Sequence, residues 1–334
     1  MLRRPASPRL ALPAAFVTMT LQKAGQWCVG RFDRIAADAW ECSSGVDLGM
    51  VWMQNTGKLR VAVNGYGVIG KRVADAVALQ PDMELAGIAD VAADWRIAVA
   101  VQRGFAIFAA SDTAGDAMRA AGLQVSGGLS DLLAVADVVV DATPKAIATA
   151  NIAAYRSAGL KFIVQGGEKH SATGHSFVAE ASYLTALNRQ STRVVSCNTT
   201  SIVRTLTALK RAGLLLKARG VLLRRATDPW ESHQGGIMNT LVPEPTIPSH
   251  QGPDAQSVDP DLDLVTMAVK VPQTLGHLHY WSVTLTRPAD RDEVLRAFRT
   301  SSRILLLRGD AGLGALNTVK EWMQDIGRPR ADLY

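Results

Sequence analysis

The chain has 334 residues, of which 48% are hydrophobic and 20% charged. This length and composition predict a globular protein with a large core and two domains. The formal net charge of +6 favours anionic ligands, but no block of Lys and Arg alternates with aromatic residues as a nucleic-acid groove would require. The apolar run from Leu10 to Leu21 contains Pro13 and is too short to span a bilayer. We therefore expect small anionic partners, no nucleic acid and no membrane.

The few cysteines indicate a protein of a reducing compartment, without a metal site. The cysteines are Cys28, Cys42 and Cys197, which form neither a disulfide framework nor a paired metal spacing. We predict no metal site and an intracellular location.

The first part of the chain, residues 1–58, lacks a folding pattern. Met1 to Gln26 is basic without an acidic residue, and no helical or strand period persists before the region that follows Met50 and Met53. We interpret residues 1–58 as a leader, disordered or added by a non-native upstream start, with a targeting extension as the alternative.

From Leu59 onward, apolar strand-like runs alternate with helical stretches. This order predicts an α/β domain over residues 59–196 with a Rossmann-type doubly wound parallel sheet. Ser130 is a plausible N-cap for a helix that starts at Asp131. The predicted strands are Leu59 to Gly65, Glu84 to Asp90, Asp137 to Thr143, Lys161 to Gln165 and Arg193 to Ser196.

The first strand runs into a glycine-rich turn that matches a dinucleotide fingerprint. Gly65 permits the tight turn, Gly67 lets the backbone approach a pyrophosphate, and Gly70 lets the helix pack on the strand. A purely structural strand-to-helix turn is the alternative. Asp90 ends the second strand, twenty residues after Gly70, where a carboxylate binds a ribose 2′-hydroxyl and repels a 2′-phosphate. This position favours NAD over NADP, unless Asp90 only caps the next helix.

Beyond residue 196 the sequence pattern changes. It predicts an α+β domain with a mainly antiparallel or mixed sheet over residues 197–334. We predict a helix from Ser201 to Ala212 and strands at Ala218 to Arg225, Leu264 to Val271 and His277 to Thr286. A proline-rich loop is expected between Asp228 and Pro260.

A nucleophile is expected at Cys197, where a strand ends and a helix begins. Helix N-terminal N–H groups favour a thiolate over a thiol, although a single cysteine is more often an inert small apolar residue. The polar neighbours Ser196, Asn198, Thr199 and Thr200 favour the functional interpretation, because such a cluster at the end of an apolar strand costs stability without a role.

Catalysis by this thiol also calls for a base. A thiolate that attacks an aldehyde forms a hemithioacetal, whose hydride can pass to a nicotinamide, leaving a thioester. His277 and His279 stand two apart on one strand and face the same way, so either can be the base. His250 in the loop is better placed for substrate contact.

On these residues the chain resembles the archaeal-type (type II) phosphorylating glyceraldehyde-3-phosphate dehydrogenases, from about Leu59 to Tyr334. Several runs match in order and spacing: residues 63–76, 139–144, 165–170, 194–200, 224–229, 248–250, 252–254 and 327–330.

The resemblance implies an oxidoreductase of glycolysis and gluconeogenesis, which oxidises glyceraldehyde 3-phosphate with NAD(P) and phosphate to 1,3-bisphosphoglycerate. It implies a cytoplasmic homotetramer with Cys197 as the nucleophile and His277 as the base. Cofactor contacts carried over by resemblance are Val68, Ile69, Gly167 and Arg225. Substrate or phosphate contacts carried over are Ser196, Cys197, Asn198, Thr227, His250 and Gln251.

The chain departs from the family pattern in three respects, which bear on the residue roles carried over by resemblance. The family usually has two histidines at His250-Gln251 and often a lysine at Asp90. Family members also continue for roughly fifty residues past the end of this chain, so the second domain is expected to be C-terminally truncated. Two alternatives follow, a catalytically impaired NAD-binding remnant and a related semialdehyde dehydrogenase.

Overall fold

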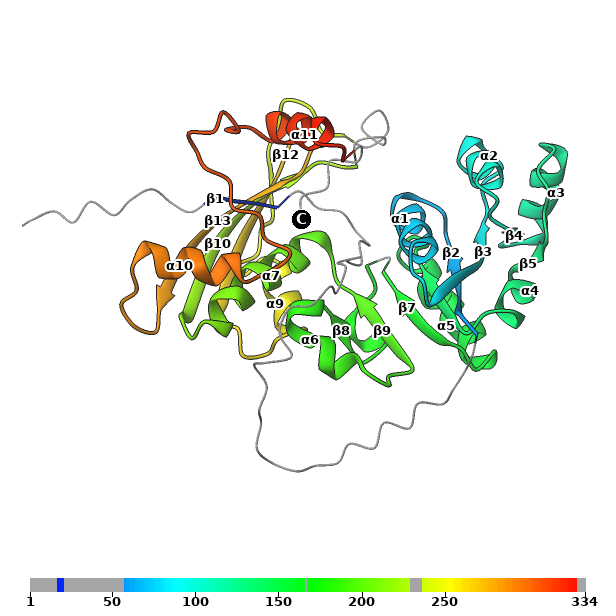
Figure 1. Cartoon of the computed structure of the whole chain (residues 1–334), viewed down its shortest axis with the longest axis horizontal. Helices are drawn as coiled ribbons and strands as arrows, with labels where there is room; N and C mark the ends of the chain where they lie inside the picture. The colour runs from blue at the N-terminus through cyan, green and yellow to red at the C-terminus, as the bar shows by residue number, and fades with distance from the viewer. Residues whose placement is uncertain (1–16, 21–56, 166, 229–235, 329–334) are drawn as a thin grey trace, which may run out of the picture. The chain divides into compact units, whose positions relative to one another are not determined.

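The computed structural model describes residues 17–20, 57–165, 167–228 and 236–328 (Figure 1). The predicted leader lies outside the described residues except for β1 (Val17–Thr20) and the last residues before Leu59. The chain divides into two compact units, which we describe separately. One comprises the described residues from 57 to Phe177 together with Leu184–Val195, and the other comprises β1, Val178–Tyr183 and the described residues from Ser196 onward.

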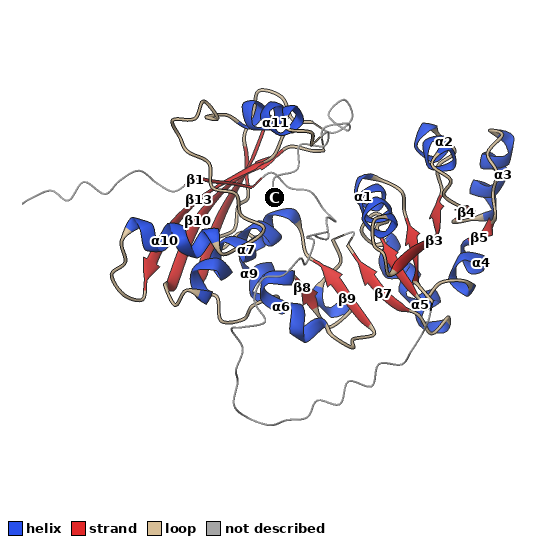
Figure 2. Ribbon diagram, viewed as in Figure 1, coloured by secondary structure: helices blue, strands red, loops and turns tan. Residues whose placement is uncertain are grey.

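The first unit is built on a parallel sheet. Within the described residues its strand order is β5-β4-β3-β2-β6-β7-β9-β8, and each strand runs parallel to its neighbours (Figure 2). The order reverses direction between β2 and β6, which is the switch point where doubly wound sheets bind ligands. The strands are β2 (Leu59–Asn64), β3 (Met83–Asp90), β4 (Ile107–Ala109), β5 (Gly127–Gly128), β6 (Val138–Asp141), β7 (Lys161–Val164), β8 (Ser176–Phe177) and β9 (Ser191–Val194).

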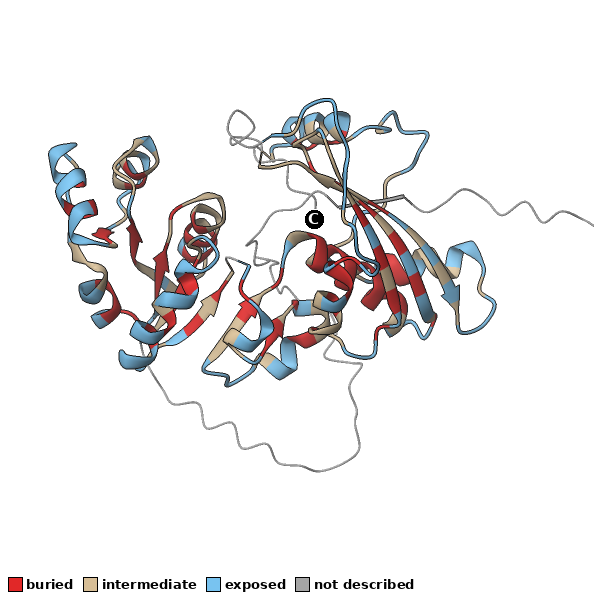
Figure 3. Ribbon diagram, turned by 180° about the vertical axis from the view of Figure 1, so that it is seen from behind, coloured by how far each residue is buried: buried red, intermediate tan, exposed pale blue. Residues whose placement is uncertain are grey.

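Helices cover both faces of this sheet, because successive strand residues point to opposite sides. Val61 and Val63 pack with α1, α2 and α3, whereas Ala62 packs with α4 and α5. Figure 3 shows the buried residues along the strands and on the sheet-facing sides of the helices. The prediction of a doubly wound sheet is confirmed. The helices that cover the sheet are α1 (Val68–Ala78), α2 (Trp95–Gln102), α3 (Asp112–Ala120), α4 (Leu129–Ala134) and α5 (Ile147–Ser157). The elements η1 (His170–Ala172) and α6 (Ala179–Ala186) follow in the chain.

The predicted cap of α4 was wrong. The helix begins at Leu129 with Gly128 as its N-cap, so Ser130 lies in the first turn. The Asp131 carboxylate accepts a hydrogen bond from the Gly128 N–H at 2.7 Å and thereby holds the helix start.

The glycine-rich turn between β2 and α1 depends on two glycines, one for its backbone conformation and one for a close backbone contact. Gly65 has φ +90°, which favours glycine. A Cβ at Gly70 would lie 1.8 Å from the Gly65 carbonyl oxygen, so only glycine lets α1 start this close to the turn. By contrast, a Cβ at Gly67 would meet nothing within 4 Å.

The second unit contains a mixed sheet with the strand order β1-β13-β10-β12-β11 among the described residues. β10 pairs parallel with β12 and antiparallel with β13, as the predicted α+β domain with a mixed sheet requires. The strands are β10 (Leu215–Arg225), β11 (Val242–Pro243), β12 (Leu264–Val271) and β13 (His277–Leu285), and the helices are α7 (Cys197–Arg211), α9 (Gln251–Gln256), α10 (Arg291–Arg299) and α11 (Leu316–Asp325).

Two boundaries predicted in this unit need correction. α7 starts at Cys197 rather than Ser201, because the Ser196 side chain caps it and accepts a hydrogen bond from the Thr199 N–H at 3.3 Å. The segment predicted as a loop between Asp228 and Pro260 contains β11 and α9, which its prolines concealed. No helix among the described residues is long and apolar enough to cross a bilayer.

The Gly70→Ala substitution should destabilise the first unit. The added methyl would press into the Gly65 carbonyl, so we expect a loss of about 1–3 kcal/mol in the free energy of unfolding. Urea denaturation followed by circular dichroism measures it. Gly67→Ala is the matched control and should change the free energy by less than about 1 kcal/mol. Equal effects at both positions would contradict the role of Gly70.

Candidate active site

The N-terminus of α7 presents the predicted nucleophile. Cys197 is the first helical residue, and its side chain is partly exposed. The start of the helix is fixed by a short chain of hydroxyls, in which Ser196 Oγ lies 2.9 Å from Thr199 Oγ1. Thr199 Oγ1 in turn donates to Asp254 Oδ2 of α9 at 2.7 Å. The sulfur therefore lies at the positive end of a helix whose first turn is tied to α9 by side-chain hydrogen bonds.

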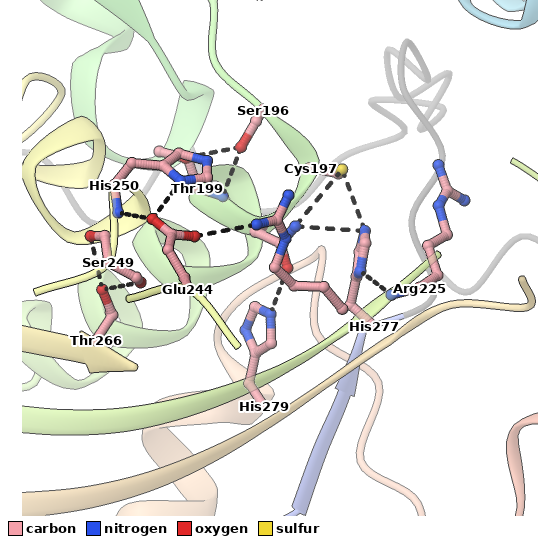
Figure 4. A network of polar contacts seen from close by, with 12 residues as sticks. Ser196, Cys197, Thr199, Arg225, Glu244, Ser249, His250, Thr266, His277 and His279 are labelled. Carbon is pink, nitrogen blue, oxygen red and sulfur yellow. Dashed lines mark hydrogen bonds and ion pairs between the residues drawn. The ribbon is translucent and has the colours of Figure 1, made fainter. Parts of the chain in front are cut away.

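The structure brings Cys197 and His277 together from distant parts of the sequence (Figure 4). His277 begins β13, and its Nε2 lies 3.2 Å from the Cys197 sulfur. On the other side of the ring, His277 Nδ1 accepts a hydrogen bond from the Arg225 backbone N–H at 3.1 Å. Because the Nδ1 lone pair is used in this way, the neutral ring carries its proton on Nε2 and points that N–H at the sulfur.

Both histidines of β13 are held neutral by burial. Burial, with the cations Arg225 and Arg224 and the ring of His279 nearby, lowers the pKa of His277 to about 3. Burial alone lowers the pKa of His279 to about 4. A ring that resists protonation this strongly is a poor proton acceptor at neutral pH.

Opposing effects act on the thiol. Burial raises the pKa of Cys197, while the Arg225 charge and the backbone N–H of Asn198 oppose that rise. Since the cysteine is partly exposed, solvent relieves part of the cost of the charged form. The Arg225 side chain is itself paired with Asp228.

The second histidine of β13 reaches a different partner. His279 Nε2 lies 2.9 Å from Asn198 Oδ1, and His279 Nδ1 lies 3.5 Å from Ser201 Oγ. Asn198 Nδ2 lies 3.9 Å from the Cys197 sulfur. The structure thus separates the two histidines that sequence reasoning left as alternatives: His277 contacts the sulfur, and His279 contacts Asn198.

The loop histidine belongs to a charged cluster in the same unit. His250 Nδ1 and its backbone N–H both contact Glu244 Oε1 at 2.7 Å, and Glu244 Oε2 pairs with Arg224 at 3.1 Å. Although burial alone would raise the pKa of Glu244, the hydrogen bonds from His250 and the Arg224 charge lower it. Sequence reasoning missed Glu244, which stands between two prolines with no periodicity around it.

Gln251, predicted beside His250 as a substrate contact, is fully buried at the start of α9. With its amide turned to suit its neighbours, the oxygen accepts from Arg224 at 3.2 Å and the nitrogen donates to Ser249 Oγ at 2.7 Å. Gln251 therefore fixes the Arg224 guanidinium. Thr227 lies partly exposed just beyond the end of β10.

In the first unit, the glycine-rich turn suits the pyrophosphate of a dinucleotide. No side chain caps the N-terminus of α1, so the N–H groups of Val68 and Ile69 in its first turn, which have no partner within the helix, remain for an anion. Open space where a Gly67 Cβ would lie allows close approach. The residues present fit a nicotinamide dinucleotide.

A buried amide oxygen supports this fit. Asn64 and Asp141 are paired in register at the carboxyl ends of β2 and β6, where the strand order reverses. Asn64 Nδ2 donates to the Tyr155 hydroxyl at 2.8 Å, whereas Asn64 Oδ1 is buried with no hydrogen-bond partner among the described residues. Such an atom at the switch point is an acceptor site for a bound ligand.

Asp90 takes part in the same turn. Its carboxylate accepts hydrogen bonds from the Tyr66 N–H at 2.5 Å and the Ala92 N–H at 2.8 Å. The alternative that Asp90 caps the next helix fails, since Asp94 caps α2. Gly167, also predicted to contact the cofactor, has φ +97°. No cluster of metal-ligating side chains occurs among the residues that the structure describes.

Comparison with known proteins agrees with this arrangement. Residues 196–323 match the model for the glyceraldehyde 3-phosphate dehydrogenase C-terminal domain, and residues 59–188 match that for the dihydrodipicolinate reductase N-terminus. Among solved structures, aspartate semialdehyde dehydrogenase II from Vibrio cholerae shares the fold, with a TM-score of 0.55 and 14% identity over 76% of this chain and 82% of that one. Fold and domains thus define an oxidoreductase with a nicotinamide cofactor.

Closer relatives identify the family. The chain is 44% identical over 277 residues to a glyceraldehyde-3-phosphate dehydrogenase of Halobacterium salinarum, covering 83% of this chain and 82% of that protein. The protein of the same name from Methanothermobacter thermautotrophicus is 42% identical over the same shares of the two chains. This chain belongs to the glyceraldehyde-3-phosphate dehydrogenase family.

The buried histidines predict acid sensitivity. Their folded pKa values, about 3 and about 4, lie below the ordinary 6.5, so the unfolded chain binds their protons first as the pH falls. The free energy of unfolding should therefore decrease as the pH is lowered from about 6.5 to about 4. The decrease should reach up to about 1.4 kcal/mol per pH unit for each ring. Urea denaturation at several pH values measures this slope. His279→Gln removes one titrating ring and should flatten it; parallel curves would contradict the assignment.

Proposed function

We propose that this protein oxidises glyceraldehyde 3-phosphate with a nicotinamide cofactor and inorganic phosphate to 1,3-bisphosphoglycerate, through a thioester on Cys197. The observation that carries the proposal is the 3.2 Å contact between the Cys197 sulfur and His277 Nε2 at the start of α7. Membership of the family indicates the aldehyde substrate, and this contact supports Cys197 as the nucleophile.

The thiol of the partly exposed Cys197 first loses its proton to solvent, so the first step needs no base on the enzyme. The thiolate of Cys197 attacks the aldehyde carbon, a C–S bond forms, and the carbonyl electron pair moves to oxygen as an alkoxide. The cofactor, when bound, supplies the hydride acceptor. Loss of hydride from that carbon restores a C=O bond and leaves a thioester on Cys197. A phosphate oxygen then attacks the thioester carbon, and the sulfur leaves as thiolate.

His277 acts in this scheme as a hydrogen-bond donor. Its proton is on Nε2, because Nδ1 accepts from the Arg225 N–H, and its pKa of about 3 disfavours a second proton. The ring therefore stabilises the thiolate and then the alkoxide through Nε2–H. We propose this role for His277 in place of the general base that the resemblance to the family implies.

The phosphate groups of substrate and product require cations and neutral donors. Arg224, positioned by Glu244 and Gln251, and the exposed ring of His250 supply them in the same unit as Cys197. Ser196 and Thr227, which are accessible, complete the proposed substrate contacts.

For the cofactor, we propose that Gly65, Gly67, Val68, Ile69 and Gly70 hold the pyrophosphate. Gly167 and Arg225 are proposed as cofactor contacts on the resemblance to the family alone. Asp90 gives a preference for NAD, since a carboxylate repels a 2′-phosphate. We also propose a cytoplasmic homotetramer, on the resemblance to the family alone.

Replacing the nucleophile should abolish turnover. In Cys197→Ser the poorly ionised hydroxyl cannot form the thioester, so NADH formation with glyceraldehyde 3-phosphate and phosphate should fall by at least about 10³-fold. Absorbance at the NADH band measures it. A serine variant with comparable activity would contradict the covalent route, and a folded parent without turnover in either cofactor would favour the impaired-remnant alternative.

Cofactor choice should respond to Asp90. The Asp90→Asn variant removes the charge that opposes a 2′-phosphate, so the ratio of kcat/KM for NADP to that for NAD should rise about tenfold. Steady-state assays with both cofactors measure this ratio. Asp94→Asn is the control, because that carboxylate is neutralised by Arg96 and should leave the ratio nearly unchanged. An unaltered ratio in Asp90→Asn would show that Asp90 only anchors the turn.

A further inference from the structure

We infer that His279 is a positioning residue that locks the side-chain amide of Asn198, so that Asn198 Nδ2 and His277 Nε2 together form a two-donor site for the thiolate and the alkoxide. This inference rests on the proposed function for the identity of the aldehyde, but the orientation of the amide can be tested without any substrate.

The direction of each hydrogen bond follows from the atoms involved. An amide oxygen only accepts, so the 2.9 Å contact with Asn198 Oδ1 places the proton of His279 on Nε2. His279 Nδ1 is then free to accept from the Ser201 hydroxyl, 3.5 Å away. With Oδ1 held by His279, the other end of the Asn198 amide, Nδ2, turns towards the sulfur of Cys197 at 3.9 Å.

Two donors now face each other. Asn198 Nδ2 lies 3.5 Å from His277 Nε2, and the Arg225 N–H has already placed a proton on that nitrogen. Two N–H groups gain little from each other, but both lie within 4 Å of the sulfur, at 3.9 Å and 3.2 Å. Such a pair suits an anionic acceptor. The acceptor is first the thiolate and then the alkoxide oxygen bonded to the carbon that the sulfur has attacked.

The position of His279 is itself well determined. Its side chain is 2% exposed, and it packs edge-on against Trp281 with ring centroids 6.3 Å apart. Trp281 in turn occupies the space above Gly220 of β10, where a Cβ would lie 2.4 Å from the indole ring. The ring is therefore fixed by the sheet and cannot turn away from Asn198 without repacking.

Burial keeps this arrangement in one protonation state. The pKa of His279 is lowered to about 4, so at neutral pH the ring has one N–H and one lone pair, which match Asn198 and Ser201. A neutral ring with so low a pKa, whose lone pair faces the Ser201 hydroxyl, is a poor proton acceptor at neutral pH. Asn198 touches the reacting sulfur and is the catalytic member of the pair, whereas His279 acts through it.

The test compares two substitutions at His279 in the full chain. His279→Leu removes the donor and frees the Asn198 amide, whereas His279→Gln keeps an N–H near the position of Nε2 but cannot act as a base. The first readout is the rate at which iodoacetamide alkylates Cys197 against pH, followed by mass spectrometry of the Cys197 peptide, since Cys28 and Cys42 also react. The second is the single-turnover rate of NADH formation without phosphate.

We expect the thiol pKa of His279→Leu to rise by about 0.5–1 unit and its hydride-transfer rate to fall about 10–100-fold. His279→Gln should restore both towards the parent values. Asn198→Leu should reproduce the effect of His279→Leu on the thiol pKa. The double variant that carries both leucine substitutions should differ little from either single variant.

Three results would overturn the inference. The first is a thiol pKa that falls or stays constant in His279→Leu, which would mean that the amide oxygen faces the sulfur. The second is a His279→Gln variant as inactive as His279→Leu, which would make His279 the base. The third is full additivity in the double variant. If instead the parent forms no NADH but the thiol pKa values keep the expected order, the proposed function fails and the inference stands.

Discussion

The geometry of the candidate active site depends on one backbone hydrogen bond, from the Arg225 N–H to His277 Nδ1. It decides which nitrogen of the ring is protonated, and hence whether the Cys197 sulfur meets a donor or an acceptor. Because Arg225 ends β10 and His277 begins β13, the antiparallel pairing of these strands brings the two residues together. The sheet thus sets a protonation state as well as a position.

The rest of the site extends this constraint. In the arrangement that we infer, Asn198 adds a second donor, held by His279, and the hydroxyl chain from Ser196 to Asp254 holds the start of α7 in place. The burial that keeps both histidines neutral costs stability in acid, because the unfolded chain takes up their protons. Function and stability are coupled here through desolvation.

Local sequence patterns predicted much of the fold. The glycine spacing and the β-α alternation predicted the doubly wound sheet, and the two-residue spacing of His277 and His279 predicted that they share a face. Errors fell where local signals compete. Ser130 is a good cap residue but lies inside α4, since the Asp131 carboxylate fixes an earlier start. Prolines around α9 concealed a short helix held by buried contacts of Gln251.

The sequence by itself determined the fold class and the family and predicted Cys197 as the nucleophile, because glycine turns, strand periods and the residues around Cys197 are short-range patterns. Only the tertiary structure decided which groups the histidines contact and that Glu244 pairs with Arg224 and His250. Residues 197 and 277 are eighty positions apart, and which ring nitrogen carries a proton depends on the groups that the folded sheet places around it. Hydrogen-bond direction is a property of neighbours in space, and no periodicity along the chain encodes it.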